Sequence, residues 1–200
     1  NYWYTVTPKC GTREGIAAAT EPTVLGNGTT LPCKFDFATE EAYRLFTVID
    51  ANGDYEAQYK WGGWLYGPSF AGADGEGPCA VYGFSPENAA DDWLITPSFL
   101  VEKGKKYRLT YTMWTRGQEE ILEVTAGTMN DIESQHAITP AQGYSHKDRK
   151  VFTQDFTASA TGNYYAGFHI TSPKKRFYLY ITDIMVDEIP DDAAPAAVSD

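Results

Sequence analysis

The sequence predicts an all-β fold, built as a sandwich or barrel of short antiparallel strands. Fourteen Tyr, ten Phe and five Trp occur among many Val, Ile and Thr, the residue types that favour a pleated, half-buried surface. Short apolar runs recur between turn residues, to which eighteen Gly and eleven Pro contribute. No stretch sustains a long amphipathic helix, so a parallel sheet with crossover helices is not expected.

The first residues predict a β-hairpin that precedes the main domain. Residues 2–10 are rich in aromatic and β-branched side chains, which favours a strand. A turn is expected over residues 11–15, and a second extended stretch runs to residue 24. The sequence Gly26-Asn27-Gly28 is a strong break. We therefore assign residues 1–28 to a separate hairpin.

From Leu31 onward, short strands are expected at the spacing typical of a sandwich or barrel. They cover residues 31–37, 44–50, 59–67, 79–84, 92–101, 106–115, 120–128, 149–157, 163–171 and 177–189. Residues 129–135 are the one segment that predicts a helical turn. The tail 191–200, rich in Ala, Asp and Pro, is typical of a linker to a following domain. The main domain is expected over residues 29–190.

Charge and cysteine content exclude several classes of protein. The net charge of −11 argues against nucleic acid as a partner, because binding a polyphosphate requires clustered Lys and Arg. No apolar run reaches the ~18 residues of a membrane span. Three cysteines (Cys10, Cys33 and Cys79) allow one disulfide at most and leave its existence open. An acidic surface is compatible with divalent cations, which take oxygen ligands, and equally with solubility alone.

The segment Asp50-Ala51-Asn52-Gly53-Asp54 is a candidate calcium loop. Asp50, Asn52 and Asp54 place three oxygen-bearing side chains on alternate positions, and Gly53 permits a tight turn. The segment lacks the distal Glu and the flanking helices of an EF-hand. The alternative is a polar Asx turn that closes a hairpin without binding a metal.

Two further carboxylates are candidate metal ligands. Asp91 and Asp92 are adjacent and would point to opposite faces of a strand, so that one, Asp92, caps a loop or binds metal. Trp93 is expected in the core. Asp183 lies within an apolar strand, where a carboxylate is expensive unless it is paired or bound to metal. If Asp183 occupies an outward position, it needs no such explanation.

Four aromatic residues, Tyr59, Trp61, Trp64 and Tyr66, are candidate ligand-binding residues. Exposed rings can stack on a sugar or anchor a protein partner. In a regular strand Tyr59 and Trp61 would share one face, and Trp64 and Tyr66 the other. One of the two faces is therefore expected to belong to the core.

Most catalytic signatures are absent from the sequence. A Cys–His nucleophile pair stays open geometrically, but no cysteine-protease signature surrounds Cys10, Cys33 or Cys79. His136, His146 and His169 lie in different segments, and neither H-E-x-x-H nor G-x-S-x-G occurs. Glu120 and Glu123 do not show the alternation expected of paired glycosidase acids, which makes solvated strand charges the better interpretation. We expect no catalysis.

Six phrases, in this order, resemble one known family. They are LPCKFDF at 31–37, IDANGD at 49–54, ADDWLITP at 90–97, KYRLTY at 106–111, YYAGFH at 164–169 and YLYITDI at 178–184. Their order and spacing over residues 31–189 are similar to the cleaved-adhesin (choice-of-anchor J) domains of Bacteroidetes surface and secreted proteins, including those that follow gingipain proteases. The phrase containing Asp91, Asp92 and Trp93 is the most specific.

The resemblance implies an antiparallel two-sheet jelly-roll β-sandwich of the galactose-binding-like type, usually stabilised by calcium and used for adhesion or ligand binding. Residues 1–25 look like the last two strands of a fibronectin type III domain, and residues 194–200 look like the entry into another. Two positions depart from the family. Cys33 stands where an aromatic residue is common, and Thr182 stands where a second Asp is common, which weakens any calcium site at that strand.

We therefore expect an extracellular recognition or adhesion module of a multidomain bacterial surface or secreted protein, located outside the cell or at the outer-membrane surface. Its expected partners are a host or bacterial surface glycan or protein and the adjacent domains of the same chain, and its expected cofactor is a structural calcium ion. The alternatives are a carbohydrate-binding module that assists a glycan-degrading enzyme, a jelly-roll hydrolase, and a spacer that binds nothing.

Overall fold

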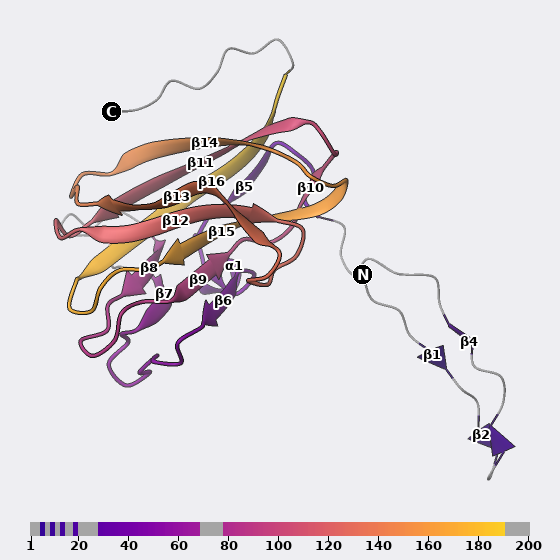
Figure 1. Cartoon of the computed structure of the whole chain (residues 1–200), viewed down its shortest axis with the longest axis horizontal. Helices are drawn as coiled ribbons and strands as arrows, with labels where there is room; N and C mark the ends of the chain where they lie inside the picture. The colour runs from indigo at the N-terminus through magenta and orange to yellow at the C-terminus, as the bar shows by residue number, and fades with distance from the viewer. Residues whose placement is uncertain are drawn as a thin grey trace.

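A computed structural model describes residues 28–68 and 78–190, together with four two-residue strands near the N-terminus (Figure 1). Residues 28–190 form two antiparallel sheets that stack as a sandwich, which confirms the predicted fold class. The elements are β5 (Cys33–Phe35), α1 (Glu40–Tyr43), β6 (Thr47–Asp50), β7 (Gly63–Gly67), β8 (Cys79–Gly83), β9 (Asp92–Ile95), β10 (Phe99–Val101), β11 (Lys106–Thr115), β12 (Glu120–Gly127), β13 (Gln135–Tyr144), β14 (Lys150–Thr157), β15 (Gly162–Ile170) and β16 (Tyr178–Ile189).

Each sheet contains six strands. The order in one is β13-β12-β15-β9-β6, with β10 also paired to β15. The order in the other is β14-β11-β16-β8-β7, with β5 also paired to β16. Strands β6 and β7 are therefore edge strands of different sheets, and β7 lies close to β9 of the other sheet.

The predicted strand over residues 92–101 is two strands in the structure. β9 and β10 pair with successive parts of β15, β9 with Gly167 to Ile170 and β10 with Gly162 to Tyr164. The interruption falls at Pro97, which has no N–H to donate to a ladder.

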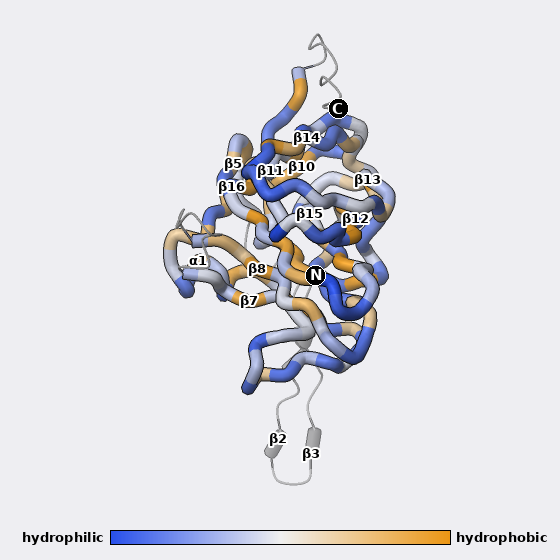
Figure 2. Tube along the Cα trace, turned by 90° about the vertical axis from the view of Figure 1, so that its left-hand side faces the viewer, coloured by the Kyte–Doolittle hydropathy of each residue, from blue (hydrophilic) through white to orange (hydrophobic). Residues whose placement is uncertain are grey.

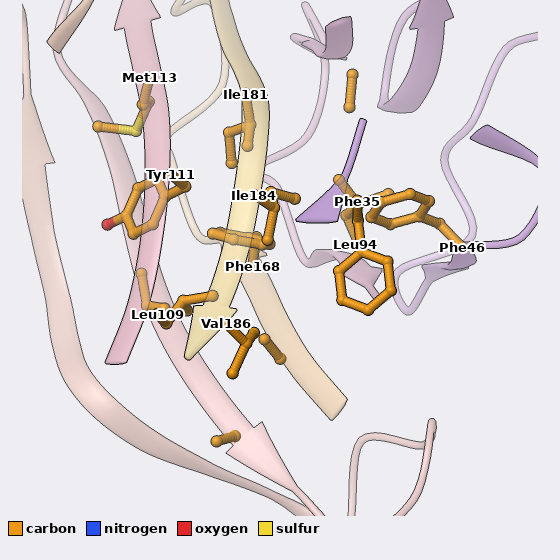
Figure 3. Packing of buried hydrophobic residues seen from close by; sticks show 14 of the residues in the cluster. Phe35, Phe46, Leu94, Leu109, Tyr111, Met113, Phe168, Ile181, Ile184 and Val186 are labelled. Carbon is orange, nitrogen blue, oxygen red and sulfur yellow. The ribbon is translucent and has the colours of Figure 1, made fainter. Parts of the chain in front are cut away.

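The main hydrophobic core fills the space between the sheets, and a smaller buried cluster comprises Cys79, Val81, Trp114 and Tyr180. In β11 buried and more exposed residues alternate from Lys106 to Met113, as expected of a strand with one face inward. Figure 3 shows Leu109, Tyr111 and Met113 of β11 beside residues of the paired strand β16, with Phe168 of β15 from the other sheet packed against them. Hydrophobic positions alternate with hydrophilic ones along many strands, as Figure 2 shows.

Two local predictions are wrong. Residues 129–135 are not helical, because the Asp131 carboxylate accepts a hydrogen bond from Ser134 N and closes a turn instead. The helical turn is α1, which begins after Thr39, whose hydroxyl accepts from Ala42 N. The edge strand β13 was not predicted, and it contains Pro140, a residue type that is tolerated at sheet edges.

The extra N-terminal hairpin is confirmed. Strand β1 (Thr5–Val6) pairs with β4 (Ala18–Ala19), and β2 (Lys9–Cys10) pairs with β3 (Arg13–Glu14), all antiparallel. Its assignment to a preceding fibronectin-like domain stays a prediction, as does the main domain over 29–190. The predicted linker, 191–200, lies outside the described residues.

Two of the three cysteines are buried free thiols, Cys33 in β5 and Cys79 in β8. Burial raises the pKa of the Cys33 thiol to about 11 and that of Cys79 to about 12. Among the described residues, no helix has the length and apolar character that a membrane crossing requires.

Candidate metal centre and the cavities beside it

Three aspartates meet where β6 ends and β9 begins, beside β7. Asp50 is the last residue of β6, and it lies directly opposite Asp92, the first residue of β9. Asp54 follows in the loop after β6. One carboxylate oxygen from each lies within 4.8 Å of the other two. Like charges placed opposite each other on neighbouring strands destabilise a sheet unless something lies between them.

The carboxylate oxygens of Asp54 and Asp92 are closed off from solvent, and none of the four accepts a hydrogen bond from the described residues. Asp92 as a whole is only 1% exposed. Burial, followed by the charges of Asp50 and Asp54, raises the pKa of Asp92 from 3.8 to about 8. A buried carboxylate without a partner is costly, so this arrangement requires a proton or a cation.

Asp50 shapes the loop that carries Asp54. Its Oδ1 accepts hydrogen bonds from Gly53 N at 2.7 Å and from Asp54 N at 3.2 Å, while its Oδ2 accepts from Tyr55 N at 2.9 Å. Gly53 has a φ of 71°, a conformation that glycine adopts without strain. The Asx turn and the metal site, which were alternatives at the level of sequence, are thus compatible here, because the same carboxylate organises the loop and joins the cluster.

Two glycines allow β7 to pass close to the carboxylates. A Cβ on Gly62 would lie 2.7 Å from Asp54 O and 2.8 Å from Asp54 Oδ1, and the φ of Gly62 is 70°. A Cβ on Gly63 would lie 3.6 Å from Asp92 Oδ1. The next residue, Trp64, donates from its indole Nε1 to Asp92 O at 3.4 Å. The sheet that contains β7 therefore covers one side of the aspartate cluster.

This donor set fits a hard divalent cation. All candidate ligand atoms are carboxylate oxygens, and their mutual separations suit oxygens arranged around one ion. The ion would be held by Asp50, Asp54 and Asp92, and its positive charge would offset much of the repulsion between their carboxylates. The predicted ligands Asp50, Asp54 and Asp92 are thus brought together.

The other two predicted ligands are placed differently. The Asn52 side-chain amide donates to Ala89 O at 2.7 Å and ties the Asp50–Asp54 loop to the loop before β9. The structure does not bring Asp183 to the cluster. Asp183 lies at an irregularity of β16 with a φ of 51°, where it forms an ion pair with Lys34 at 2.8 Å. That outward position removes the need for a metal.

Two cavities flank the cluster. The tyrosine cleft, about 610 Å³ in volume, is lined by Glu40, Tyr43, Arg44, Val48, Asp50, Tyr55, Lys60, Gly63, Trp64, Leu65, Tyr66 and Pro68. The loop groove, about 540 Å³, is lined by Asn52, Gly53, Asp54, Glu56, Tyr59, Trp61, Ser85, Pro86, Glu87, Asn88 and Ala89. Asp50 borders the first cavity and Asp54 the second, so the metal cluster forms part of both walls.

The four aromatic candidates divide between these cavities. Trp64 and Tyr66, on β7, line the tyrosine cleft, but Trp64 is only 3% exposed and belongs to the core, contrary to its expected role as an exposed ligand-binding ring. Tyr59 and Trp61 line the loop groove. Tyr59 and Trp61 precede β7 and lie in a turn. The predicted strand over 59–67 is therefore wrong for its first residues.

A histidine that the sequence left unassigned bridges three strands near the cluster. His169 Nε2 lies 2.8 Å from Asp91 Oδ1, and Nδ1 lies 3.1 Å from Glu123 Oε2. The imidazole stacks on Trp93, with ring centroids 3.9 Å apart and planes 10° apart. Because the three polar residues come from β12, β15 and the start of β9, no local motif could reveal the bridge.

Solved structures with this architecture include cleaved adhesin domains. The K1 and K3 cleaved adhesin domains of Lys-gingipain from Porphyromonas gingivalis W83 match with TM-scores of 0.58 and 0.57 and identities of 20% and 19%. The alignments cover 79% and 78% of this chain, and 98% and 96% of those domains. The CBM22-1-GH10 modules of the Clostridium thermocellum xylanase 10B, solved with xylohexaose, match at 0.50 with 10% identity, over 78% of this chain and 28% of that one.

No protein-family model matches the sequence, and no curated protein matches it. The similarity to solved structures is therefore a similarity of fold. It confirms the jelly-roll sandwich and the likeness to cleaved adhesin domains that the sequence phrases indicated.

Proposed function

We propose that this chain is a non-catalytic recognition module of the adhesion type, with loops fastened by a structural calcium ion. The observation that carries the proposal is the cluster of Asp50, Asp54 and Asp92, in which buried oxygens have no hydrogen-bond partner among the described residues. Calcium is the preferred ion because it binds six to eight oxygen ligands in flexible geometry, whereas magnesium demands a near-ideal octahedron.

The position of the cluster supports a structural role for the ion. The ion would join the end of β6, the loop after it and the start of β9, next to the glycines before and in β7. The loops that border both cavities would then be held by one ionic centre. Because the oxygens of Asp54 and Asp92 are closed off from solvent, the ion would lie inside the protein rather than at a ligand-exposed surface.

The same enclosure favours binding over hydrolysis. A jelly-roll glycosidase needs two carboxyl groups that face a substrate across a cleft, about 5–10 Å apart. Asp92 has a raised pKa and two neighbouring carboxylates, as such an acid would, but its oxygens are inaccessible to a substrate. Burial and the charges of Asp50 and Asp54 account for the raised pKa of Asp92 without a catalytic role.

The partner is proposed to be a surface glycan or protein, contacted through the loops beside the metal cluster. The cleaved adhesin domains that share the fold support adhesion outside the cell as the setting. Residues 1–28 and 191–200 would connect the module to neighbouring domains of the same chain.

Calorimetric titration of the metal-free protein with calcium tests the proposal. We expect one calcium ion to bind per chain, and we expect its binding to raise the melting midpoint, since a ligand that binds only the native state stabilises it. The Asp54→Asn variant should bind calcium at least about tenfold more weakly, because a neutral amide replaces a charged ligand. Identical melting curves with calcium and with chelator would remove calcium from the function.

A further inference from the structure

Tyr59 and Trp61 form a ring pair at the rim of the loop groove. Their ring centroids are 4.7 Å apart, their planes are inclined by 35°, and Tyr59 is 59% exposed. Large exposed aromatic rings that border a cavity are typical of ligand-binding surfaces, because they offer apolar area with little rotamer entropy to lose.

The backbone under the ring pair is held in place. Tyr59 N and Lys60 N both donate to Glu56 O, and Glu56 N donates to Trp61 O, which closes the turn on itself. Gly62 N then donates to Gly83 O of the neighbouring strand. The exposed ring of Tyr59 and the half-buried ring of Trp61 thus lie on an ordered turn, so that binding would require little further ordering.

The opposite wall of the groove is equally ordered. Ser85 Oγ accepts hydrogen bonds from Glu87 N and Asn88 N, and fixes the turn that presents these two exposed side chains. Asn52 ties the two walls together through Ala89 O. Carboxylates and amides therefore line the groove on a framework that does not need the ligand to form.

The lining distinguishes between classes of ligand. Among the described residues that line the loop groove there is no Lys or Arg, whereas Glu56 and Glu87 carry exposed carboxylates, and the enclosed carboxylate of Asp54 belongs to the metal cluster. Lys60, between the two rings in sequence, lines the tyrosine cleft instead. An anionic ligand would find no counter-charge here, so uronates, sulfates and phosphates are excluded by charge.

A cationic side chain is also a poorer match than a sugar. An ammonium group only donates hydrogen bonds, whereas the amides of Asn52 and Asn88 offer both donors and acceptors. Sugar hydroxyls use both. A volume of about 540 Å³ also exceeds what one lysine side chain fills, and it falls in the range of cavities that bind small organic ligands.

We propose that the loop groove binds a neutral glycan, with a pyranose ring stacked on Trp61 or Tyr59 and its hydroxyls donating to Glu56 and Glu87. The inference rests on the proposed function, because it names the ligand of the recognition module. The groove shares Asp54 with the metal cluster, so the metal ion would also hold one wall of the glycan site.

A glycan array probed with the full chain in calcium tests this inference. The array carries neutral xylan, glucan, mannan and galactan oligosaccharides, acidic polygalacturonate and sulfated fragments, and a lysine-rich peptide. We expect binding to neutral oligosaccharides alone. The affinity for the neutral hexasaccharide that binds best is then measured by calorimetry for the wild-type protein and its variants.

Trp61→Ala and Glu87→Gln should each weaken that binding by at least about tenfold, while Tyr55→Ala, which alters the tyrosine cleft, should change it by less than about twofold. Glu87 is exposed, so its variant folds even if loss of Trp61 disturbs the turn, and melting curves verify both. Binding only to acidic glycans or to the peptide, binding unaffected by both groove variants, or no binding at all would overturn the inference. Calcium binding measured on the same samples tests the proposed calcium site independently of glycan binding.

Discussion

Replacing Asp92 with Asn should have opposite effects on stability with and without calcium. In the metal-free protein Asp92 is buried beside two carboxylates, and its pKa is raised from 3.8 to about 8. The folded protein therefore holds a proton at neutral pH that the unfolded chain releases. Asparagine is neutral in both states and can donate from its amide to the neighbouring carboxylates, so the substitution removes this penalty.

The size of the effect follows from the proton. Holding a proton at neutral pH on a group that ionises near pH 4 when unfolded costs the fold at most roughly 4 kcal/mol. Relaxation of the loop around Asp54 reduces this, and we expect a gain of about 1–3 kcal/mol for the metal-free variant. For a domain of this size, that gain raises the melting midpoint by roughly 2–12 °C.

Calcium should reverse the order of stability. At a thousandfold excess over its Kd, a ligand of the native state stabilises the wild-type protein by about 4.1 kcal/mol, or roughly 8–16 °C, which exceeds the gain of the metal-free variant. The Asp92→Asn variant has lost one of three charged ligands and should gain much less. The wild-type protein would then be the more stable of the two in calcium and the less stable in chelator.

Differential scanning calorimetry in chelator and in calcium measures both effects, with Asp183→Asn as the matched control. Asp183 makes an exposed ion pair with Lys34 and has a positive φ that Asn also tolerates, so this variant should lose less than about 1 kcal/mol and keep the full response to calcium. A metal-free Asp92→Asn protein less stable than wild type would refute the argument from buried charge. An equal calcium response in wild type and variant would refute the assignment of the site.

The remaining predictions concern the same region and the core. Calcium affinity should increase as the pH rises towards about 8, because calcium displaces the proton on Asp92. The metal-free fold should lose stability as the pH rises from about 4 to 8, since only the folded state retains that proton in this window. Calorimetric titration at several pH values would show the opposite trend if another group dominated. Gly62→Ala should abolish calcium binding and destabilise the fold by more than about 1 kcal/mol, since its Cβ would overlap the neighbouring aspartate and its φ is positive; an unchanged urea midpoint would contradict this. His169→Ala should cost about 1–3 kcal/mol in urea unfolding, because two carboxylates lose their shared partner, and a neutral outcome would mean that solvent replaces it. Cys33 and Cys79 should react with a thiol reagent only at the rate of unfolding, because burial raises both pKa values; rapid labelling of the native protein at both sites would contradict their burial.

The strands of the sandwich could be predicted from alternation, and the exceptions have local causes. The alternation in residues 106–115 matches β11 in full, since a long central strand faces the core on one side only. The strand expected over 59–67 begins only at Gly63, because Glu56 binds Lys60 and Trp61 through the backbone and closes a turn first. The alternation of aromatic residues does not distinguish a continuous strand over 59–67 from a turn followed by a strand that begins at Gly63.

The metal cluster could be predicted only in part. The spacing of Asp50 and Asp54 is local and visible in the sequence. Asp92 joins them because of the register of β6 against β9. Asp183 stays away from the cluster because the pairing of β16 with β11 is irregular at that point. Both are matters of strand pairing between distant segments. The bridge formed by His169 was missed for the same reason.

Pro140 in strand β13 affects how copies of the module behave next to one another. It lies in an edge strand of ten residues whose pairing with β12 is irregular, and it removes one N–H from that edge. A long, regular edge would be a template for pairing with the same edge of another molecule, and proline and irregular pairing are the features by which natural sheets prevent this. Copies of the module that meet at this edge can therefore remain separate.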